Sequence, residues 1–342
     1  EFYYSPDGSQ IAVVTPGEIK LVVVNGGQRE QVLTYTPVNT ASEYRFYARP
    51  VWSLDGSALR VAIPPADPFA RPFAQTTIWH IPTDGSPAQM LTGIDAAPLL
   101  SSDSPAFSSD LDYVAYAQIR QPEGASPEEG EPWLEILRLA NGDRQAYPYT
   151  GDLIRWAPDS LRLAFIAGRY EPRLYIGQWS GGSTPGAADP EKDVFDVRWV
   201  DGEHYLFLTR SGAQRGPEQD GWDLVLADIS GASTILASMD SYPRYDFAVD
   251  PSAAHLAGPA RPITPTPAAT RPAAERTPPT RTPVAALPGL VYQTDDGLWI
   301  DRGGQRVRLL DRRVAQLSPD GVHALYLAGD GDDRDLWLAV LP

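Results

Sequence analysis

The sequence predicts an all-β protein, a seven-bladed β-propeller of four-stranded antiparallel blades. Three observations predict this fold: an Asp-centred turn motif recurs along the chain, an alternating apolar strand follows each copy, and a second apolar strand follows the first. Because a propeller grows by adding blades around one axis, residues 1–342 are predicted to form a single domain.

The turn motif is an aromatic or apolar residue, two spacers and an Asp that Gly often follows. Asp-Gly suits a tight hairpin, because Gly adopts positive φ and the Asp carboxylate accepts nearby backbone N–H groups. Most copies are about 40–50 residues apart, the length of a four-stranded blade. The fifth copy is one residue short. The seven copies centre on Asp7, Asp55, Asp110, Asp159, Asp201, Asp250 and Asp320.

Each turn is followed by apolar residues at the fourth and sixth positions after the Asp, which period-two geometry places on one face of a strand. These pairs are Ile11 and Val13, Leu59 and Val61, Val114 and Tyr116, Leu163 and Phe165, Tyr205 and Phe207, Ala254 and Leu256, and Ala324 and Tyr326. The second apolar strands are predicted at 19–24, 77–81, 133–139, 174–179, 222–229, 298–301 and 336–341.

Residues 259–288 interrupt blade six with a proline- and threonine-rich stretch. Proline removes backbone donors and fixes φ, so an extended or disordered insertion is predicted. Four Arg residues against the single Glu275 make the stretch basic. It is interpreted either as a solvated loop with no binding role or as an arm that binds an anionic surface or a neighbouring subunit.

The two ends of the sequence suggest that the last blade is incomplete. Glu1 falls in the first predicted strand of blade one, and Pro342 ends the third strand of blade seven. Either residues upstream of Glu1 supply the missing strand, or the ring closes with a three-stranded blade. A signal peptide or membrane anchor upstream of Glu1 would fit the same gap. No apolar run reaches the length of a membrane span.

The segments Ser5-Pro6-Asp7-Gly8 and Ser318-Pro319-Asp320-Gly321 resemble the repeats of TolB and related WD40-like propellers, known as SPDG or PD40 repeats. The resemblance covers nearly the whole chain outside the proline-rich stretch. It implies a propeller fold and a place outside the cytoplasm, in the periplasm, at the cell surface or secreted. It does not specify a function, because propellers carry many unrelated activities.

Several kinds of chemistry find no support in the sequence. The chain has no Cys, so disulfides and thiolate metal sites are excluded, and its net charge of −16 disfavours a nucleic-acid partner. The four His residues lack metal-ligand spacing, and His204 and His323 are predicted to be solvated hairpin residues. The acidic run 330–335 is interpreted as a solvated hairpin in preference to a calcium site. No catalytic residue, metal or cofactor is predicted.

Surface side chains in the connections between blades are the remaining candidates for function. Aromatic and Arg side chains are favoured anchors of protein interfaces. The predicted partner-binding residues are Tyr44, Arg45, Phe46, Tyr47, Arg49, Arg244 and Arg312. The alternative for the segment 44–49 is ordinary packing between blades.

The expected function is that of a non-catalytic binding scaffold or accessory subunit of a cell-envelope complex, with protein partners. Association with a membrane is expected only through an upstream anchor or through a partner. Two alternatives stay open. One is a propeller enzyme, a hydrolase or lyase acting on a sugar or lactone, and the other is a glycan- or ligand-sensing domain of a larger envelope protein.

Overall fold

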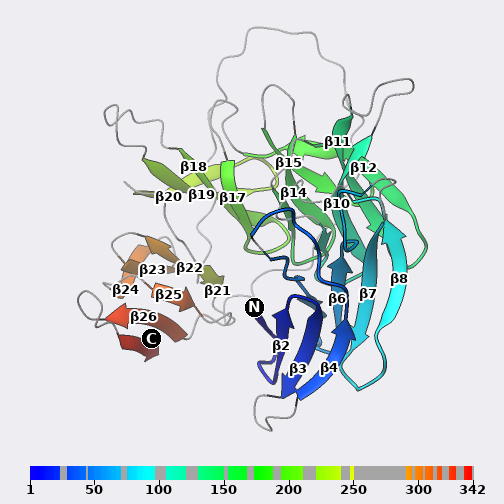
Figure 1. Ribbon diagram of the computed structural model, residues 1–342. Coiled ribbons are helices and arrows are strands. Elements are labelled where there is room, and N and C mark those ends of the chain that lie inside the picture. The colour runs from blue at the N-terminus through cyan, green and yellow to red at the C-terminus, as the bar shows by residue number, and fades with distance from the viewer. Residues whose placement is uncertain are drawn as a thin grey trace, which may run out of the picture. The chain divides into compact units, whose positions relative to one another are not determined.

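A computed structural model describes most of the chain (Figure 1). The described residues are 1–23, 29–43, 45–70, 75–96, 105–120, 130–149, 153–167, 173–187, 194–210, 221–239, 247–249, 290–294, 297–302, 305–310, 314–317, 323–328 and 335–340. All regular structure in these residues is β-structure, in seven antiparallel sheets that follow one another along the chain. The described residues contain no helix long and apolar enough to span a membrane.

Residues 1–186 form a compact unit of four four-stranded sheets. The first sheet contains β1 (Phe2–Tyr4), β2 (Gln10–Thr15), β3 (Glu18–Val23) and β4 (Arg29–Thr34). The second contains β5 (Val51–Trp52), β6 (Ala58–Ile63), β7 (Thr76–Pro82) and β8 (Gln89–Ile94). The third contains β9 (Ala106–Phe107), β10 (Tyr113–Arg120), β11 (Glu131–Arg138) and β12 (Arg144–Pro148). The fourth contains β13 (Ile154–Trp156), β14 (Arg162–Ala167), β15 (Arg173–Gln178) and β16 (Ser183–Pro185).

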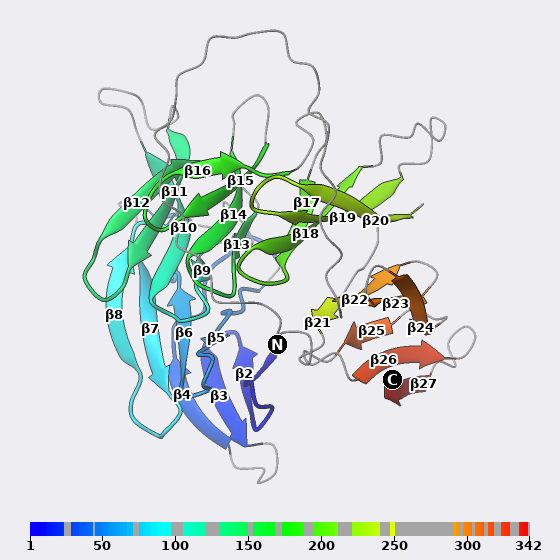
Figure 2. The same cartoon turned by 180° about the vertical axis from the view of Figure 1, so that it is seen from behind.

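Residues 187–342 form a second compact unit with the remaining three sheets (Figure 2). The fifth sheet contains β17 (Val194–Trp199), β18 (His204–Arg210), β19 (Trp222–Asp228) and β20 (Ser233–Met239). The sixth contains β21 (Phe247–Val249), β22 (Leu290–Thr294), β23 (Gly297–Arg302) and β24 (Gln305–Leu310). The seventh has three strands among the described residues: β25 (Val314–Leu317), β26 (His323–Ala328) and β27 (Asp335–Val340).

The Asp-centred turns begin the sheets as the sequence predicts. Ser53 Oγ donates to Asp55 Oδ1 at 2.6 Å, and the same carboxylate oxygen accepts the backbone N–H of Ser57 at 3.0 Å. Gly56 adopts φ +71°, a left-handed conformation that favours glycine. These local bonds close the turn, so β5 and β6 are placed side by side by residues within a few positions of each other.

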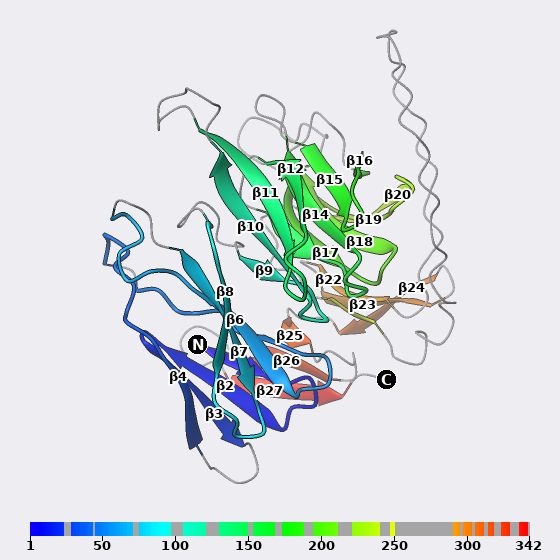
Figure 3. The ribbon, with the colours of Figure 1, turned by 90° about the vertical axis from the view of Figure 1, so that its right-hand side faces the viewer.

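The sheets of the first unit follow one another in space (Figure 3), and buried apolar side chains pack between neighbouring sheets. On β10, Val114 and Tyr116 lie in a buried cluster with Ile78 and Ile94 of the second sheet. Residues 115 and 117, on the opposite face of β10, pack in another cluster with side chains of the fourth sheet. The indole N–H of Trp52 donates to the backbone carbonyl of Tyr3 at 3.1 Å and so links the first two sheets.

The predicted strands are confirmed in the first five sheets, and one prediction for the sixth is wrong. The strand that pairs with β21 is β22, with Phe247 opposite Tyr292 and Val249 opposite Leu290. The expected strand around Ala254 and Leu256 therefore does not occupy this place. Residues 250–289, including the proline-rich stretch 259–288, lie outside the described residues.

Each sheet has two different ends. One end, here called the hairpin edge, carries the connections from the first to the second strand and from the third to the fourth strand. The other end, here called the loop edge, carries the connection from the second to the third strand and the passage to the next sheet. Among the described strands of the first five sheets, the widest sequence separations are those between β4 and β5, β6 and β7, β8 and β9, β10 and β11, and β18 and β19, and in each case the flanking strands end and begin at the loop edge.

Candidate functional site

Four of the residues predicted to bind a partner are described, and they lie between β4 and β5, at the loop edge. Arg45 and Arg49 are exposed, whereas Phe46 and Tyr47 are half-buried and pack against the apolar cluster shared by the first two sheets. The two aromatic rings therefore contribute to packing, which leaves the two Arg side chains as the accessible part of this segment. Tyr44, Arg244 and Arg312 lie outside the described residues. The binding role of all seven residues stays a prediction.

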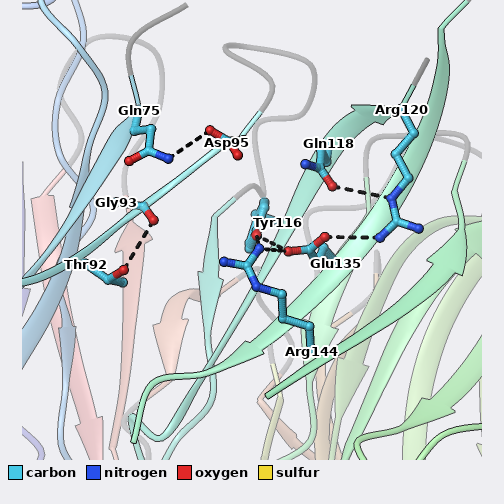
Figure 4. Close-up of polar contacts among 9 residues, drawn as sticks. All are labelled: Gln75, Thr92, Gly93, Asp95, Tyr116, Gln118, Arg120, Glu135 and Arg144. Atoms are coloured by element: carbon cyan, nitrogen blue, oxygen red, sulfur yellow. Dashed lines mark hydrogen bonds and ion pairs between the residues drawn. The ribbon is translucent and has the colours of Figure 1, made fainter. Parts of the chain in front are cut away.

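A polar cluster that joins three strands is centred on Glu135 of β11 (Figure 4). Its side chain is only 5% exposed. One carboxylate oxygen accepts hydrogen bonds from the Tyr116 hydroxyl and from Arg144 Nη1, and the other accepts from Arg120 Nη2 at 3.1 Å. Arg144 Nη1 also lies 3.0 Å from the Tyr116 hydroxyl oxygen. This Glu135 network joins β10, β11 and β12.

The strand register brings these side chains together. Tyr116 lies directly opposite Glu135, and Leu137, two residues further along β11, lies opposite Arg144. Side chains two positions apart on a strand share a face, so the network occupies the face of the third sheet that packs on the second. A carboxylate at this depth needs hydrogen-bond donors or cations around it, and here it has both.

The electrostatics of the network hold it in one protonation state. Burial raises the pKa of Glu135, but the hydrogen bonds from Tyr116 and Arg120 and the charge of Arg144 outweigh burial, and the net pKa is lowered. Burial and the hydrogen bond to Glu135 raise the pKa of Tyr116 far above its usual value. Near neutral pH the carboxylate is therefore ionised and the phenol protonated. The ionised carboxylate positions the two arginines.

Arg120 ends β10 at the loop edge and is held on three sides. Its guanidinium lies 4.9 Å from the centre of the Trp133 ring, its Nε donates to Gln118 Oε1 at 3.4 Å, and its Nη2 donates to Glu135. The side chain is nevertheless 42% exposed. Arg144 is 48% exposed but begins β12 at the hairpin edge. One buried carboxylate therefore fixes two accessible arginines at opposite ends of the same sheet.

The loop edge of the second sheet adds polar groups on the side facing the network (Figure 4). Gln75 Nε2 donates to Asp95 Oδ1 at 3.0 Å, and both residues are exposed. The carboxylate of Asp95 is close enough to contribute to the raised pKa of Tyr116. This part of the molecule presents donors, acceptors and both signs of charge to solvent.

The fifth sheet, in the second unit, carries a similar combination of Arg and aromatic side chains at its own loop edge. The Arg210 guanidinium lies 5.5 Å from the Phe195 ring and 5.8 Å from the Trp222 ring. As in the third sheet, an Arg ends the second strand and a Trp lies near the start of the third. The sequence shows this signal as Arg120 with Trp133 and Arg210 with Trp222, but the sequence-based prediction missed it because it considered only connections between sheets.

One histidine prediction is corrected by the structure. His204 is not a solvated hairpin residue: its side chain is 23% exposed, and its Nδ1 lies 2.9 Å from Asp201 Oδ2. His323 lies at the start of β26, and nothing is described of its side chain. Among the described residues, no group of three or more His, Asp or Glu side chains is arranged to hold a metal ion.

No protein-family model and no curated protein sequence matches the chain. Among solved structures, dipeptidyl peptidase 4 of Porphyromonas gingivalis is similar over 99% of this chain and 51% of its own, with 9% identity and a TM-score of 0.55. A putative TolB from Agrobacterium tumefaciens matches 70% of this chain and 80% of its own, with 16% identity and a TM-score of 0.41. The β-propeller domain of the Trilobed protease from Pyrococcus furiosus matches 73% and 72%, with 15% identity and a TM-score of 0.47.

These similarities concern the fold alone. The chain spans about half the length of the dipeptidyl peptidase 4 structure. Together with seven antiparallel sheets in succession, the comparison confirms the β-propeller class predicted from the repeats.

Proposed function

We propose that this chain is a protein-binding β-propeller that engages its partner through the loop edge of its sheets. The observation that carries the proposal is Arg120, an accessible side chain held in one position by Trp133, Gln118 and the buried Glu135. Arg and Trp are enriched among the residues that dominate binding energy at interfaces. A side chain that is already fixed loses little conformational entropy when a partner binds it.

The two ends of the sheets differ, and this difference also supports the loop edge as the binding surface. The hairpin edge repeats short Asp-centred turns whose polar side chains bond to their own backbone, as at Ser53 and Asp55. In the first unit, the loop edge carries the exposed Arg45 and the contact of Arg120 with Trp133. Binding residues are concentrated on loops that a rigid scaffold positions.

The location of the protein and the kind of complex it joins are proposed from the resemblance of the turn motif to TolB-like repeats. We place the protein outside the cytoplasm, as a scaffold or accessory subunit of a cell-envelope complex. Its partner is a protein that offers a carboxylate or carbonyl oxygen to Arg120, because a guanidinium recognises such oxygens with directed hydrogen bonds. The expected role is recognition and not turnover of a substrate.

Co-purification from the envelope of the source organism tests the proposal, with a pair of matched variants. Arg120→Ser and Arg144→Ser each remove one of the two cations from Glu135, and the two side chains are similarly exposed, but only Arg120 is at the loop edge. We expect the same protein partner with wild type and Arg144→Ser, and a loss of about tenfold or more with Arg120→Ser, as for an interface anchor.

Two outcomes would overturn the proposal. If both variants retain the partner equally, Arg120 does not contact it. If the chain is recovered alone and converts a sugar or lactone substrate, the protein is an enzyme. Comparable thermal stability of the two variants, measured on the same preparations, shows that any difference in partner recovery arises from the surface and not from unfolding.

A further inference from the structure

The turns that begin the first three sheets are closed by a serine hydroxyl. In the second sheet, Ser53 lies two residues before Asp55, donates to its carboxylate and accepts the backbone N–H of Ala58 at 3.0 Å. Ser5 and Ser108 make the same two contacts in the first and third sheets. The hydroxyl therefore links the carboxylate to the backbone on the far side of each turn.

The turn of the fourth sheet has no such hydroxyl, because Ala157 stands at the serine position. A cation three residues after the Asp bonds the carboxylate in its place: Arg162 Nη1 donates to Asp159 Oδ2 at 2.8 Å. The Arg162 side chain is 7% exposed. A positive charge at this position thus substitutes for the missing hydroxyl.

In the turn of the fifth sheet, a histidine occupies the position three residues after the Asp and contacts its carboxylate. This turn is one residue shorter, with the Val200 backbone N–H donating to the carbonyl of His204 at 2.9 Å. His204, again three residues after the Asp, places Nδ1 at 3.0 and 2.9 Å from the two carboxylate oxygens of Asp201. The same carboxylate also accepts the backbone N–H groups of Glu203 at 2.7 Å and His204 at 2.6 Å.

The charges around the His204 ring all favour its protonated form. Asp201 and Glu203 belong to its own turn, and Asp228 on β19 lies directly opposite it in the strand register. The hydrogen bond with Asp201 raises the pKa of His204 more than burial lowers it, and the three negative charges raise it further. The pKa of Asp201 shifts in the opposite direction. Burial raises it, but the hydrogen bonds from the His204 ring and from two backbone N–H groups outweigh burial, and the net pKa is lowered.

We infer that the His204–Asp201 contact is a pH-sensitive clamp, which holds the turn between β17 and β18 closed when His204 is charged and loosens it when the ring is neutral. The inference is independent of the proposed binding function. Neutral imidazole keeps an ordinary hydrogen bond to Asp201 but loses the charge that strengthens it. The fourth turn has no imidazole at this position, and a guanidinium holds its carboxylate instead.

The direction of the pH effect follows from linkage. The folded-state pKa of His204 lies above its ordinary value of 6.5. A group whose pKa is raised by folding stabilises the folded state fully below its unfolded pKa. That stabilisation is lost as the pH rises through the folded-state pKa, so the clamp is closed in mildly acidic and open in alkaline solution.

Two measurements on the intact chain test the clamp. NMR titration of the His204 ring, assigned by its absence in His204→Gln, gives its pKa directly. Hydrogen exchange of the peptide covering residues 200–206, corrected for the intrinsic pH dependence of exchange, gives the stability of the turn. From about pH 5.5 to about pH 8.5 we expect its protection to fall by about threefold or more in wild type and to stay constant in His204→Arg.

Asp201→Asn provides a control that leaves the histidine in place. The clamp predicts that this variant returns the ring pKa toward 6.5. A wild-type ring that titrates at or below 6.5, or an equal change in protection in wild type and His204→Arg, overturns the inference. If a variant fails to fold, the wild-type ring titration still decides the question.

Discussion

Replacing Glu135 by Ala tests the energetics of the Glu135 network. The change leaves the hydroxyl of Tyr116, which is fully buried, without its carboxylate acceptor. An unsatisfied buried hydroxyl costs about 1–3 kcal/mol, and the one lost methylene, Cγ, adds roughly 0.8 kcal/mol. The arginines are 42% and 48% exposed and regain hydration, so they add little. We expect Glu135→Ala to lower the free energy of unfolding by about 3 kcal/mol, which is the lower limit for breaking a buried ion pair.

Hydrogen exchange of the β10 and β11 amide groups measures this loss within the third sheet, without requiring the two compact units to unfold together. Glu131→Ala on the same strand is the matched control, because this carboxylate is exposed, and we expect a change within about 0.5 kcal/mol. A double-mutant cycle with Tyr116→Phe isolates the energetic cost of leaving the Tyr116 hydroxyl without an acceptor. The double variant should be more stable than the sum of the single changes predicts, by about 1 kcal/mol. Strict additivity, or a loss below about 1 kcal/mol for Glu135→Ala, would refute the reasoning.

Three further predictions follow from local contacts. Trp52→Phe removes the indole N–H that links the first two sheets and should cost about 1 kcal/mol in chemical denaturation, while a neutral result would show that this bond is dispensable. Ser53→Ala should raise the pKa of Asp55 from about 2 toward its ordinary range in a carboxyl NMR titration, because the serine hydroxyl is the main cause of the low value. Gly177→Ala places a Cβ 2.9 Å from the Phe165 ring and should destabilise the fourth sheet by about 1–3 kcal/mol; unchanged hydrogen exchange there would contradict it.

Most of the fold could be predicted from the sequence because the information is local. The carboxylate of Asp55 bonds backbone groups within its own turn, and the strands on either side are marked by alternating apolar residues. The sixth sheet shows the limit of this method. The prediction assumed that a strand follows Asp250 at once, whereas the pairing partner of β21 is found at Leu290–Thr294. Sequence spacing cannot show which of two apolar segments reaches the sheet when a long insertion separates them.

The candidate site depends on contacts between strands, which the sequence shows only indirectly. Tyr116 and Arg144 are 28 positions apart and meet because the register aligns them across β11. The visible signal was Glu135, a charged residue between apolar neighbours in the middle of β11. His204 was misjudged for a related reason: the missing serine and the shortened turn were visible, but not that a residue three positions after the Asp replaces the hydroxyl.

Site-specific photo-crosslinking in the source organism tests the proposed binding surface most directly. A crosslinking side chain is placed at Ile119, which is 40% exposed beside Arg120 at the loop edge, or at Ser86, which is exposed in a hairpin of the second sheet. A surface that binds a protein at the loop edge predicts one specific protein adduct from position 119 and none from position 86. An adduct from position 86 alone, or no adduct from position 119 while the partner still co-purifies, would contradict it.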